Sequence, residues 1–303
     1  MSAKMIPVLT ITDAILTSST IAEPDAGDGA AWAAGTTYAL AATVSKNHVN
    51  YESVQAGNLG NDPETDDGTW WTAGLATNRW GVFDGYLQNQ TTQANSATWV
   101  ITPGTVVNSV SFFNMAAAEV TIIVTDPTDG EVYNETFPLV DNDAVIDAYT
   151  YFLSPIVTKS NFCVTDIPPY AAAAISITVT ETGGTVSVGQ ISLGYYETLG
   201  ETIDEVPLGI DDYTRLNEDA FGRTSPAIRG YARTAAASIS VDASRVPYLE
   251  RLLAGQRGTP TVWAFDTQFS DSELVYIGYY ENYSFEYQYA SKNILDLEIR
   301  SLV

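Results

Sequence analysis

The sequence contains a single cysteine, Cys163, and a single histidine, His48. One cysteine cannot form a disulfide within the chain, and it cannot supply the thiolates of a cysteine-based metal site. Cys163 lies in an apolar run typical of a strand, so we expect a small buried side chain. His48 would be the only base for a serine nucleophile, and no Gly-x-Ser-x-Gly motif is present. We therefore predict no catalytic residue and no enzyme.

Basic residues are also scarce. The chain has 13 lysines and arginines against 37 acidic residues, which gives a net charge of −24. Such a surface repels nucleic acid and argues against a sequence-specific nucleic-acid partner. It suits a conduit through which DNA passes without sticking, and it suits plain solubility equally well. No phosphate-binding loop or dinucleotide fingerprint occurs, so we predict no cofactor.

Long apolar runs are missing as well. No segment approaches the ~20 apolar residues of a membrane span, so we expect no membrane insertion. Met1 to Thr12 lacks the apolar core of a signal peptide, which predicts synthesis in a cytoplasm. An acidic loop before Gly68 is similar to a calcium loop, but its glycine is one place late and the downstream glutamate is missing. We predict a solvated turn there and no metal site.

The clearest pattern lies near the C-terminus. Residues Tyr231 to Val241 alternate with period two, which is typical of a half-buried strand. Ser244 is the predicted cap of a helix, Pro247 fits its first turn, and Gly255 supplies its end. Apolar residues repeat at helical spacing between these points, at Val246, Leu249, Leu252 and Leu253. This is the only helix that the sequence predicts with clear start and stop signals.

Four strand-like segments follow, rich in β-branched and aromatic residues: Thr261–Phe265, Leu274–Tyr280, Tyr283–Tyr289 and Ile294–Ile299. The phrase from Arg229 to Val303 resembles the tail-tube fold of long-tailed bacteriophages, which distal tail proteins also use. An ordinary α+β domain with a covering helix is the alternative. The resemblance implies a tail-tube-like α+β assembly domain with one helix over residues 201–303, including a preceding arm.

Arginine is concentrated in this part of the chain. Eight of the nine basic residues after position 200 are arginine, the side chain favoured at protein interfaces. The predicted assembly interface consists of Arg229, Arg233, Arg245, Arg251 and Arg257. With the tail-tube resemblance, these residues would join copies of the chain into a ring, a hexamer by family resemblance. An arm within residues 201–229 would add a strand to a neighbouring subunit.

Residues 31–77 are marked by aromatic side chains. Such a short segment cannot build a large core, so aromatics must do most of its packing. The order of Trp32, Tyr38, Tyr51 and the pair Trp70–Trp71 resembles a small three-stranded, chitin-binding type of carbohydrate-binding module. Ala41–Ala42 stand where that family usually has Gly-Asp. The resemblance implies sugar stacking by aromatic faces. The alternative is that these aromatics form the core of the module.

The candidate sugar-stacking residues are Trp32, Tyr51, Trp70 and Trp71. Neighbouring residues of a strand point to opposite faces, so Trp70 and Trp71 cannot both be buried on one side. We therefore expect Tyr38 and one tryptophan of the pair inside the module, and the other tryptophan outside. Residues 1–30 before this module are predicted as an N-terminal strand or arm followed by a linker.

Residues 78–200 are predicted to form a jelly-roll β-sandwich, because short strand-like runs alternate with turn signals. The runs are Ala97–Ile101, Val107–Asn114, Val120–Val124, Val132–Leu139, Tyr149–Leu153, Asn161–Val164, Ala174–Thr180 and Val186–Tyr195. The opening Trp-x-x-Phe-Asp-Gly at Trp80 and the closing segment Val186–Gly194 resemble galactose-binding-like sandwiches. Members of that superfamily often bind glycans at one end, which makes Phe83, Asp84 and Tyr86 candidates. Trp80 and Phe83 are alternatively core residues.

The predicted fold class is thus mainly β, with three modules in series. Taken together, the resemblances imply a structural virion protein at the tail tip or baseplate of a long-tailed bacteriophage. It would assemble at the end of the tail tube, contact other tail-tip proteins and present modules to host surface glycans. A free carbohydrate-binding or glycan-processing protein is the alternative. A spacer whose modules bind nothing is a third hypothesis.

Overall fold

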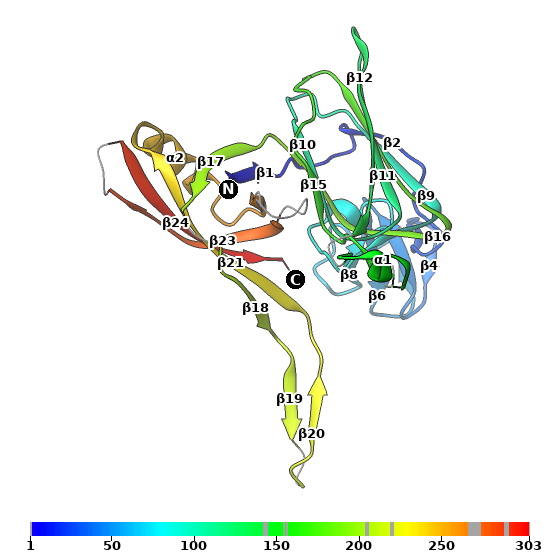
Figure 1. Ribbon diagram of the computed structural model, residues 1–303. Coiled ribbons are helices and arrows are strands. Elements are labelled where there is room, and N and C mark those ends of the chain that lie inside the picture. The colour runs from blue at the N-terminus through cyan, green and yellow to red at the C-terminus, as the bar shows by residue number, and fades with distance from the viewer. Residues whose placement is uncertain are drawn as a thin grey trace.

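A computed structural model describes residues 2–141, 145–153, 155, 157–203, 206–218, 221–265, 274–287 and 291–302. The chain is mainly β and forms a closed barrel, a second body built on a seven-stranded sheet, called the sandwich here after its prediction, and a small module beside it (Figure 1). A long two-stranded ribbon projects from the barrel. No helix among these residues has the length and apolar character needed to cross a membrane.

The barrel is closed by six antiparallel strands. They are β1 (Ser2–Pro7), β17 (Glu197–Thr202), β21 (Tyr231–Asp242), β22 (Thr261–Phe265), β23 (Leu274–Glu286) and β24 (Lys292–Ser301). Their order is β17-β1-β22-β23-β24-β21, and pairing of β17 with β21 closes the circle. The predicted N-terminal strand is therefore a barrel strand, inserted between β17 and β22. Both ends of the described chain contribute to one barrel.

The barrel interior explains the predicted alternation. Ala235, Ala237, Ile239 and Val241 of β21 are all buried in one apolar cluster. The two predicted strands Leu274–Tyr280 and Tyr283–Tyr289 form one strand, β23, with an irregularity near Tyr280. The end of the second segment lies outside the described residues.

The predicted helix is α2 (Val246–Gly255), and it covers the barrel core with Val246, Leu249 and Leu253. The prediction that Ser244 caps it is wrong. A short 3-10 turn, η2 (Ala243–Arg245), precedes the helix, Arg245 occupies the cap position, and no side chain caps the helix. Packing of the apolar face and the proline in the first turn therefore define this start.

The projecting ribbon is named the arm here and comprises residues 208–230. It contains β18 (Leu208–Asp212), which pairs with β21, and a hairpin of β19 (Arg215–Glu218) and β20 (Thr224–Ala227). Figure 1 shows the arm extending away from both the barrel and the sandwich. Within residues 201–229, where an arm was predicted, the described residues from Leu208 onward thus form an extended ribbon.

The sandwich encloses a second core. Its strands are β2 (Leu16–Ser19), β9 (Thr91–Ile101), β10 (Ser109–Ala116), β11 (Glu119–Asp126), β12 (Gly130–Pro138), β15 (Phe162–Val164) and β16 (Ala174–Gly194). The two predicted strands Ala174–Thr180 and Val186–Tyr195 form the single long strand β16. Its register against β9 shifts between Thr180 and Thr185, where Gly183 has a φ of 78°. The strand thus passes the predicted turn with a bulge rather than reversing direction.

One predicted strand of the sandwich is wrong. Residues Tyr149–Leu153 belong to a short helix, α1 (Ala148–Leu153), between β13 (Val140–Asp141) and β14 (Val157–Thr158). The Asp147 carboxylate accepts a hydrogen bond from the backbone N–H of Thr150, at 2.7 Å. This contact satisfies a backbone donor of the first helical turn. The segment was predicted as a strand because it is rich in aromatic residues, which are common in strands. The same hydrogen bond lowers the pKa of Asp147.

The small module has a four-stranded sheet where three strands were predicted. Its strands are β3 (Ala30–Ala31), β5 (Thr43–Lys46), β6 (Val49–Ser53) and β8 (Trp71–Ala76), with a separate pair of β4 (Thr37–Tyr38) and β7 (Asn58–Leu59). β3 runs parallel to β5, and the other neighbours are antiparallel. The turn η1 (Gly81–Phe83) follows and leads into the sandwich.

A third apolar layer joins the barrel to the sandwich. Ile6, Val262 and Ile277 from the outer face of the barrel pack with Phe113 of β10. The backbone N–H of Leu9 donates to the carbonyl of Leu193 at 2.8 Å, so the chain enters and leaves the sandwich at the same place. The two bodies are therefore held by packing and backbone hydrogen bonds, not by a loose linker.

Candidate functional site

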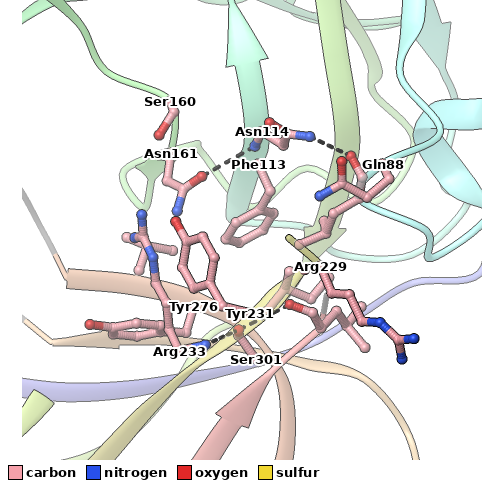
Figure 2. Close-up of a pocket in the computed structure, with 15 residues that line it drawn as sticks. Gln88, Phe113, Asn114, Ser160, Asn161, Arg229, Tyr231, Arg233, Tyr276 and Ser301 are labelled. Carbon is pink, nitrogen blue, oxygen red and sulfur yellow. Dashed lines mark hydrogen bonds between the residues drawn. The ribbon is translucent and has the colours of Figure 1, made fainter. Parts of the chain in front are cut away.

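A pocket of about 580 Å³ lies between the barrel and the sandwich, at the base of the arm (Figure 2). Its apolar lining comes from Leu87 and Phe113 on the sandwich side and from Val275, Ile277 and Leu302 on the barrel side. Pockets of this size hold ligands of drug-like dimensions or a few side chains of a partner. We call it the arm-base pocket.

Polar groups from both bodies surround this lining. Figure 2 shows Tyr231 and Arg233 from the barrel side reaching toward Asn161 of the sandwich, whereas the Arg229 side chain extends away from Asn161 on the other side of the pocket. The Asn161 side-chain oxygen accepts a hydrogen bond from the backbone of Asn114 at 3.2 Å, and the backbone N–H of Arg233 donates to the hydroxyl of Ser301 at 2.8 Å. The walls of the pocket are thus fixed by local hydrogen bonds.

The arginine side chains at this pocket differ from several other cations of the chain. Five of those cations have an acidic partner: Lys46, Arg79, Arg245, Lys292 and Arg300. Within the part of the chain that the structure describes, Arg229 and Arg233 have no such ion pair, although acidic residues outnumber basic ones almost threefold. The pocket therefore keeps a positive potential on an otherwise acidic protein.

A smaller hollow of about 310 Å³ adjoins the pocket and shares Arg233 with it. Lys159 and Asp141 both line this hollow, so its charges partly balance. Tyr276 lies between the two spaces, and burial raises the pKa of its phenol. Cys163 also lines the hollow, and its sulfur receives a hydrogen bond from Ser111 at 3.1 Å.

The five arginines predicted to form an interface do not lie together. Arg229 and Arg233 lie at the arm-base pocket, whereas Arg245 and Arg251 lie on or next to α2, at the other end of the barrel (Figure 1). Arg245 is 3.8 Å from the Glu197 carboxylate, and Arg251 donates to a backbone carbonyl of its own helix. Arg257 follows α2. Proximity in the sequence thus concealed two separate surfaces.

The arm exposes a row of large apolar side chains. They are Leu208, Ile210, Tyr213, Leu216, Phe221 and Ile228. The exposed fraction reaches 87% for Phe221 and 84% for Ile228. Helix α1 exposes a second group on the sandwich, which includes Tyr149 and Phe152. Contiguous apolar side chains on a surface mark contact sites, so the arm is the strongest candidate interface of the described chain. A sequence search for alternating apolar residues in the polar segment after Glu201 would have found it.

In the small module, Trp71 is the inward member of the tryptophan pair. It is 3% exposed, packs edge-on against Tyr38 with ring centres 5.2 Å apart, and donates its indole N–H to the carbonyl of Asn61. Trp70 is half-buried, and its backbone N–H donates to Asp66. Trp71 is therefore a core residue with no face open to a sugar, whereas Trp70 keeps part of its surface in solvent.

Trp32 and Tyr51 lie around a small ion cluster. The Lys46 ammonium lies 4.6 Å from the centre of the Trp32 ring and contacts the carboxylates of Asp62 and Glu64 at 2.6 and 3.0 Å. The hydrogen bond from Lys46 holds the pKa of Asp62 below its ordinary value. Burial, followed by the charge of Glu64, raises the pKa of Tyr51. The buried indole nitrogen of Trp32 has no hydrogen-bond partner, so this face retains an unused donor.

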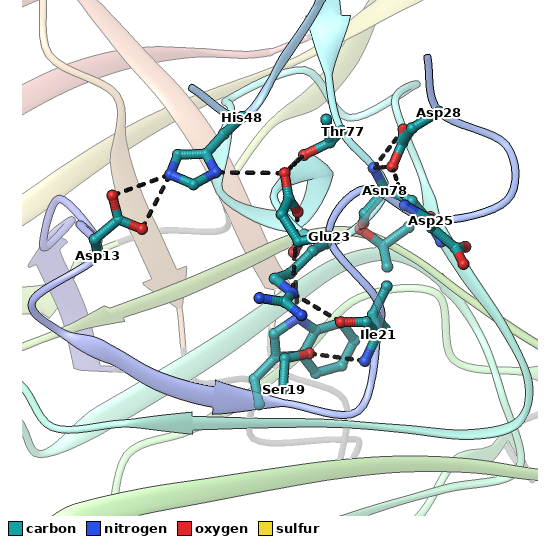
Figure 3. A network of polar contacts seen from close by, with 12 residues as sticks. Asp13, Ser19, Ile21, Glu23, Asp25, Asp28, His48, Thr77 and Asn78 are labelled. Atoms are coloured by element: carbon teal, nitrogen blue, oxygen red, sulfur yellow. Dashed lines mark hydrogen bonds and ion pairs between the residues drawn. The ribbon is translucent and has the colours of Figure 1, made fainter. Parts of the chain in front are cut away.

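His48 belongs to a network that fixes the small module to the rest of the chain (Figure 3). Its ring stacks on Trp80 with centres 4.1 Å apart and contacts Asp13 and Glu23 through its two nitrogens, at 3.1 and 3.4 Å. Glu23 also accepts a hydrogen bond from Thr77 at 2.7 Å. The histidine contacts no nucleophile in this network, so its visible role is to hold three segments together.

The candidate glycan-binding residues at the start of the sandwich also include both buried core residues and exposed residues. Trp80 is 8% exposed and Phe83 packs against the sandwich core, as the core interpretation predicted. Asp84 accepts hydrogen bonds from the backbone of Tyr86 and the amide of Asn89, at 2.8 and 2.5 Å. Burial nevertheless raises the pKa of Asp84. Its carboxylate is thus engaged in local structure, while Tyr86 is exposed.

The described residues contain no group of three or more histidines, cysteines and carboxylates that could hold a metal ion. A scan against protein-family models found no match, and searches of curated proteins and of solved structures found no similar protein. The candidate functional features of the described chain are therefore the arm, the arm-base pocket and the aromatic face of the small module.

Proposed function

We propose that the chain is a structural assembly protein that forms a ring at the tail tip or baseplate of a long-tailed bacteriophage. The exposed apolar arm is the observation that carries this proposal, since an isolated subunit gains nothing from six large apolar side chains in water. In this assignment the protein acts in the virion, next to tail-tube and other tail-tip proteins. Assembly and binding are its activities, not catalysis.

The closed barrel supports assembly through the arm. A sheet that closes on itself leaves no unpaired edge for a neighbouring strand. The arm is the part of this sheet system that extends beyond the closed circle, because β18 pairs only with β21 in the described sheet. Contacts between copies of the chain would therefore use the ribbon, by strand addition or by packing of its apolar side chains.

The free energy available from burial of the arm side chains is of the size expected for repeated contacts around a ring. Full burial of one large apolar side chain contributes roughly 1.5–3 kcal/mol. Burial of Leu216, Phe221 and Ile228 would give about 5–8 kcal/mol before the cost of association, which is of similar size. One such contact is weak alone. A closed ring makes each subunit contact two neighbours, which stabilises the assembly without large single interfaces.

The small module would supply glycan binding in this proposal. Trp32, Tyr51 and the half-buried Trp70 retain aromatic surface, and the carboxylates around Lys46 supply acceptors for sugar hydroxyls. Weak binding at one module would be multiplied by several copies in a ring. The alternative, a free carbohydrate-binding protein, is favoured by the same aromatic face but has no use for the arm.

Molar mass by light scattering over a range of concentrations, with and without tail-tube protein, tests the proposal. We expect concentration-dependent assembly that weakens in Leu216→Ser and Ile228→Ser. Leu40→Ser is the matched control, because Leu40 is an exposed leucine of the small module, 63% accessible, and lies outside the arm. A monomer at every concentration that ignores tube protein would refute ring assembly. Glycan binding lost in Trp32→Ala would then make the carbohydrate-binding alternative the leading one.

A further inference from the structure

The two faces of the arm hairpin differ in chemistry. Arg215 pairs with Ala227, and Glu218 pairs with Thr224. Because side chains of a strand alternate and paired residues share a face, Leu216, Glu218 and Pro226 lie on one face. Arg215 lies on the opposite face by the same alternation. One face of the hairpin is therefore apolar and acidic, while the other carries a cation.

The tip of the hairpin adds a large apolar side chain. Phe221 is the most exposed large apolar side chain of the described residues. The Glu218 carboxylate lies beside the turn, 3.6 Å from the position that a Cβ of Gly222 would occupy. A bulky ring and a carboxylate are thus presented together at the far end of the arm.

The arm-base pocket has the complementary chemistry. Its apolar lining at Leu87, Phe113 and Val275 suits an aromatic ring, and Arg229 and Arg233 at its side suit a carboxylate. Guanidinium groups bind carboxylates with paired hydrogen bonds, and these two have no acidic partner among the described residues. The pocket is therefore a receptor for a group that is both apolar and anionic.

The tip cannot enter the pocket of its own subunit. The arm runs from Leu208 to Glu218, which spans roughly 30 Å at ~3.3 Å per residue. Figure 1 shows its tip at the far end of the ribbon from the barrel. A second copy of the chain can place its tip there, and a head-to-tail arrangement, in which each tip enters the pocket of the next copy, continues around a ring.

We infer that the arm-base pocket receives the arm tip of a second copy, with the Phe221 ring on the apolar lining and Glu218 beside Arg229 and Arg233. This inference depends on the proposed self-assembly, and it adds the residues that each copy contributes to the contact. Phe221 is the anchor, because an exposed ion pair contributes far less than a buried aromatic ring. Glu218 sets the orientation of the tip.

Self-association measured by sedimentation equilibrium tests this pairing. Phe221→Ala should weaken association about 30- to 100-fold, which corresponds to burial of one aromatic side chain. Phe221 is almost fully exposed, so this change leaves the fold of the subunit intact. The variants Glu218→Arg and Arg229→Glu/Arg233→Glu should each weaken association as well, by about 5-fold or more. Arg251→Glu is the control, since that arginine lies on α2, away from the pocket.

A mixture of the two charge-reversed variants tests whether Glu218 contacts Arg229 and Arg233 directly. In the mixture, the tip of the Glu218→Arg variant can bind the pocket of the Arg229→Glu/Arg233→Glu variant, and the unchanged tip can bind the unchanged pocket. We therefore expect the mixture to associate more tightly than either variant alone. If the wild type assembles and the single variants assemble equally well, or if the mixture restores nothing, the pairing of tip and pocket is refuted while ring assembly stands. If the wild type is a monomer, both the pairing and the proposed function fail.

Discussion

Substitution of Gly200 by alanine tests the closure of the barrel. Gly200 lies on β17, next to the two residue pairs that join this strand to β21. A Cβ at position 200 would lie 2.2 Å from the carbonyl oxygen of Ser240 and 2.9 Å from a methyl carbon of Ile239. The first contact is with backbone, so it cannot be relieved by rotation of a side chain.

The size of the effect follows from this geometry. A Cβ and a carbonyl oxygen need somewhat more than 3 Å, so the two strands must separate by about 1 Å at this point. The hydrogen bonds between β17 and β21 then weaken, at about 1 kcal/mol each, and overpacking of a core adds roughly 1–3 kcal/mol. We expect Gly200→Ala to destabilise the barrel by about 2–4 kcal/mol.

Hydrogen exchange read by mass spectrometry is the suitable assay, because it reports on β17 and β21 separately from the sandwich. Amides of both strands should exchange about 30- to 900-fold faster, while those of β9 and β16 should not change. Gly255→Ala is the control, since no atom lies within 4 Å of the new Cβ at that exposed end of α2. That change should be neutral or slightly stabilising. Equal exchange rates in Gly200→Ala and the wild type would refute the close pairing of β17 with β21 that closes the barrel.

Three further outcomes are expected. Trp71→Ala should cost the small module about 3–5 kcal/mol in thermal unfolding, and Trp70→Ala much less, because only Trp71 is fully packed. Ile6→Ala should weaken the layer between barrel and sandwich by about 2–4 kcal/mol and separate one calorimetric transition into two. The hydrogen bond from Lys46 lowers the pKa of Asp62, so its stabilisation is complete above about pH 4 and is lost as the pH falls further. Asp62→Asn should flatten that acid dependence of the melting temperature.

Periodicity predicted the elements whose two faces differ in environment. The strand from Tyr231 and helix α2 were recognised because one face of each is apolar and packs in the barrel core. The same reasoning failed at Tyr149–Leu153, where the aromatic side chains are exposed and a single aspartate starts a helix. Aromatic composition favours strands only where the side chains pack on a sheet.

Long-range pairing lay beyond the reach of the sequence. Nothing in Ser2–Pro7 specifies β22 and β17 as its neighbours, because every apolar strand presents the same backbone donors and acceptors. The candidate sites show the same limit. Arginine content predicted an interface, but only the fold separates Arg229 and Arg233 at the pocket from Arg245 and Arg251 near α2. The neighbouring amides of Asn114 and Asn161 carry no sequence pattern at all.

The position of β1 has a consequence for the order of folding. Its barrel partners begin at Glu197, so the whole sandwich and the small module lie between two adjacent strands of one barrel. During synthesis β1 must wait for these partners, and closing so long a loop is slow unless the intervening part folds first. Folding of the sandwich brings Leu9 and Leu193 together through a backbone hydrogen bond, and this places β1 close to β17. An insert whose two ends meet in this way could be exchanged for another without a change in the barrel, which would let one barrel carry different inserted domains.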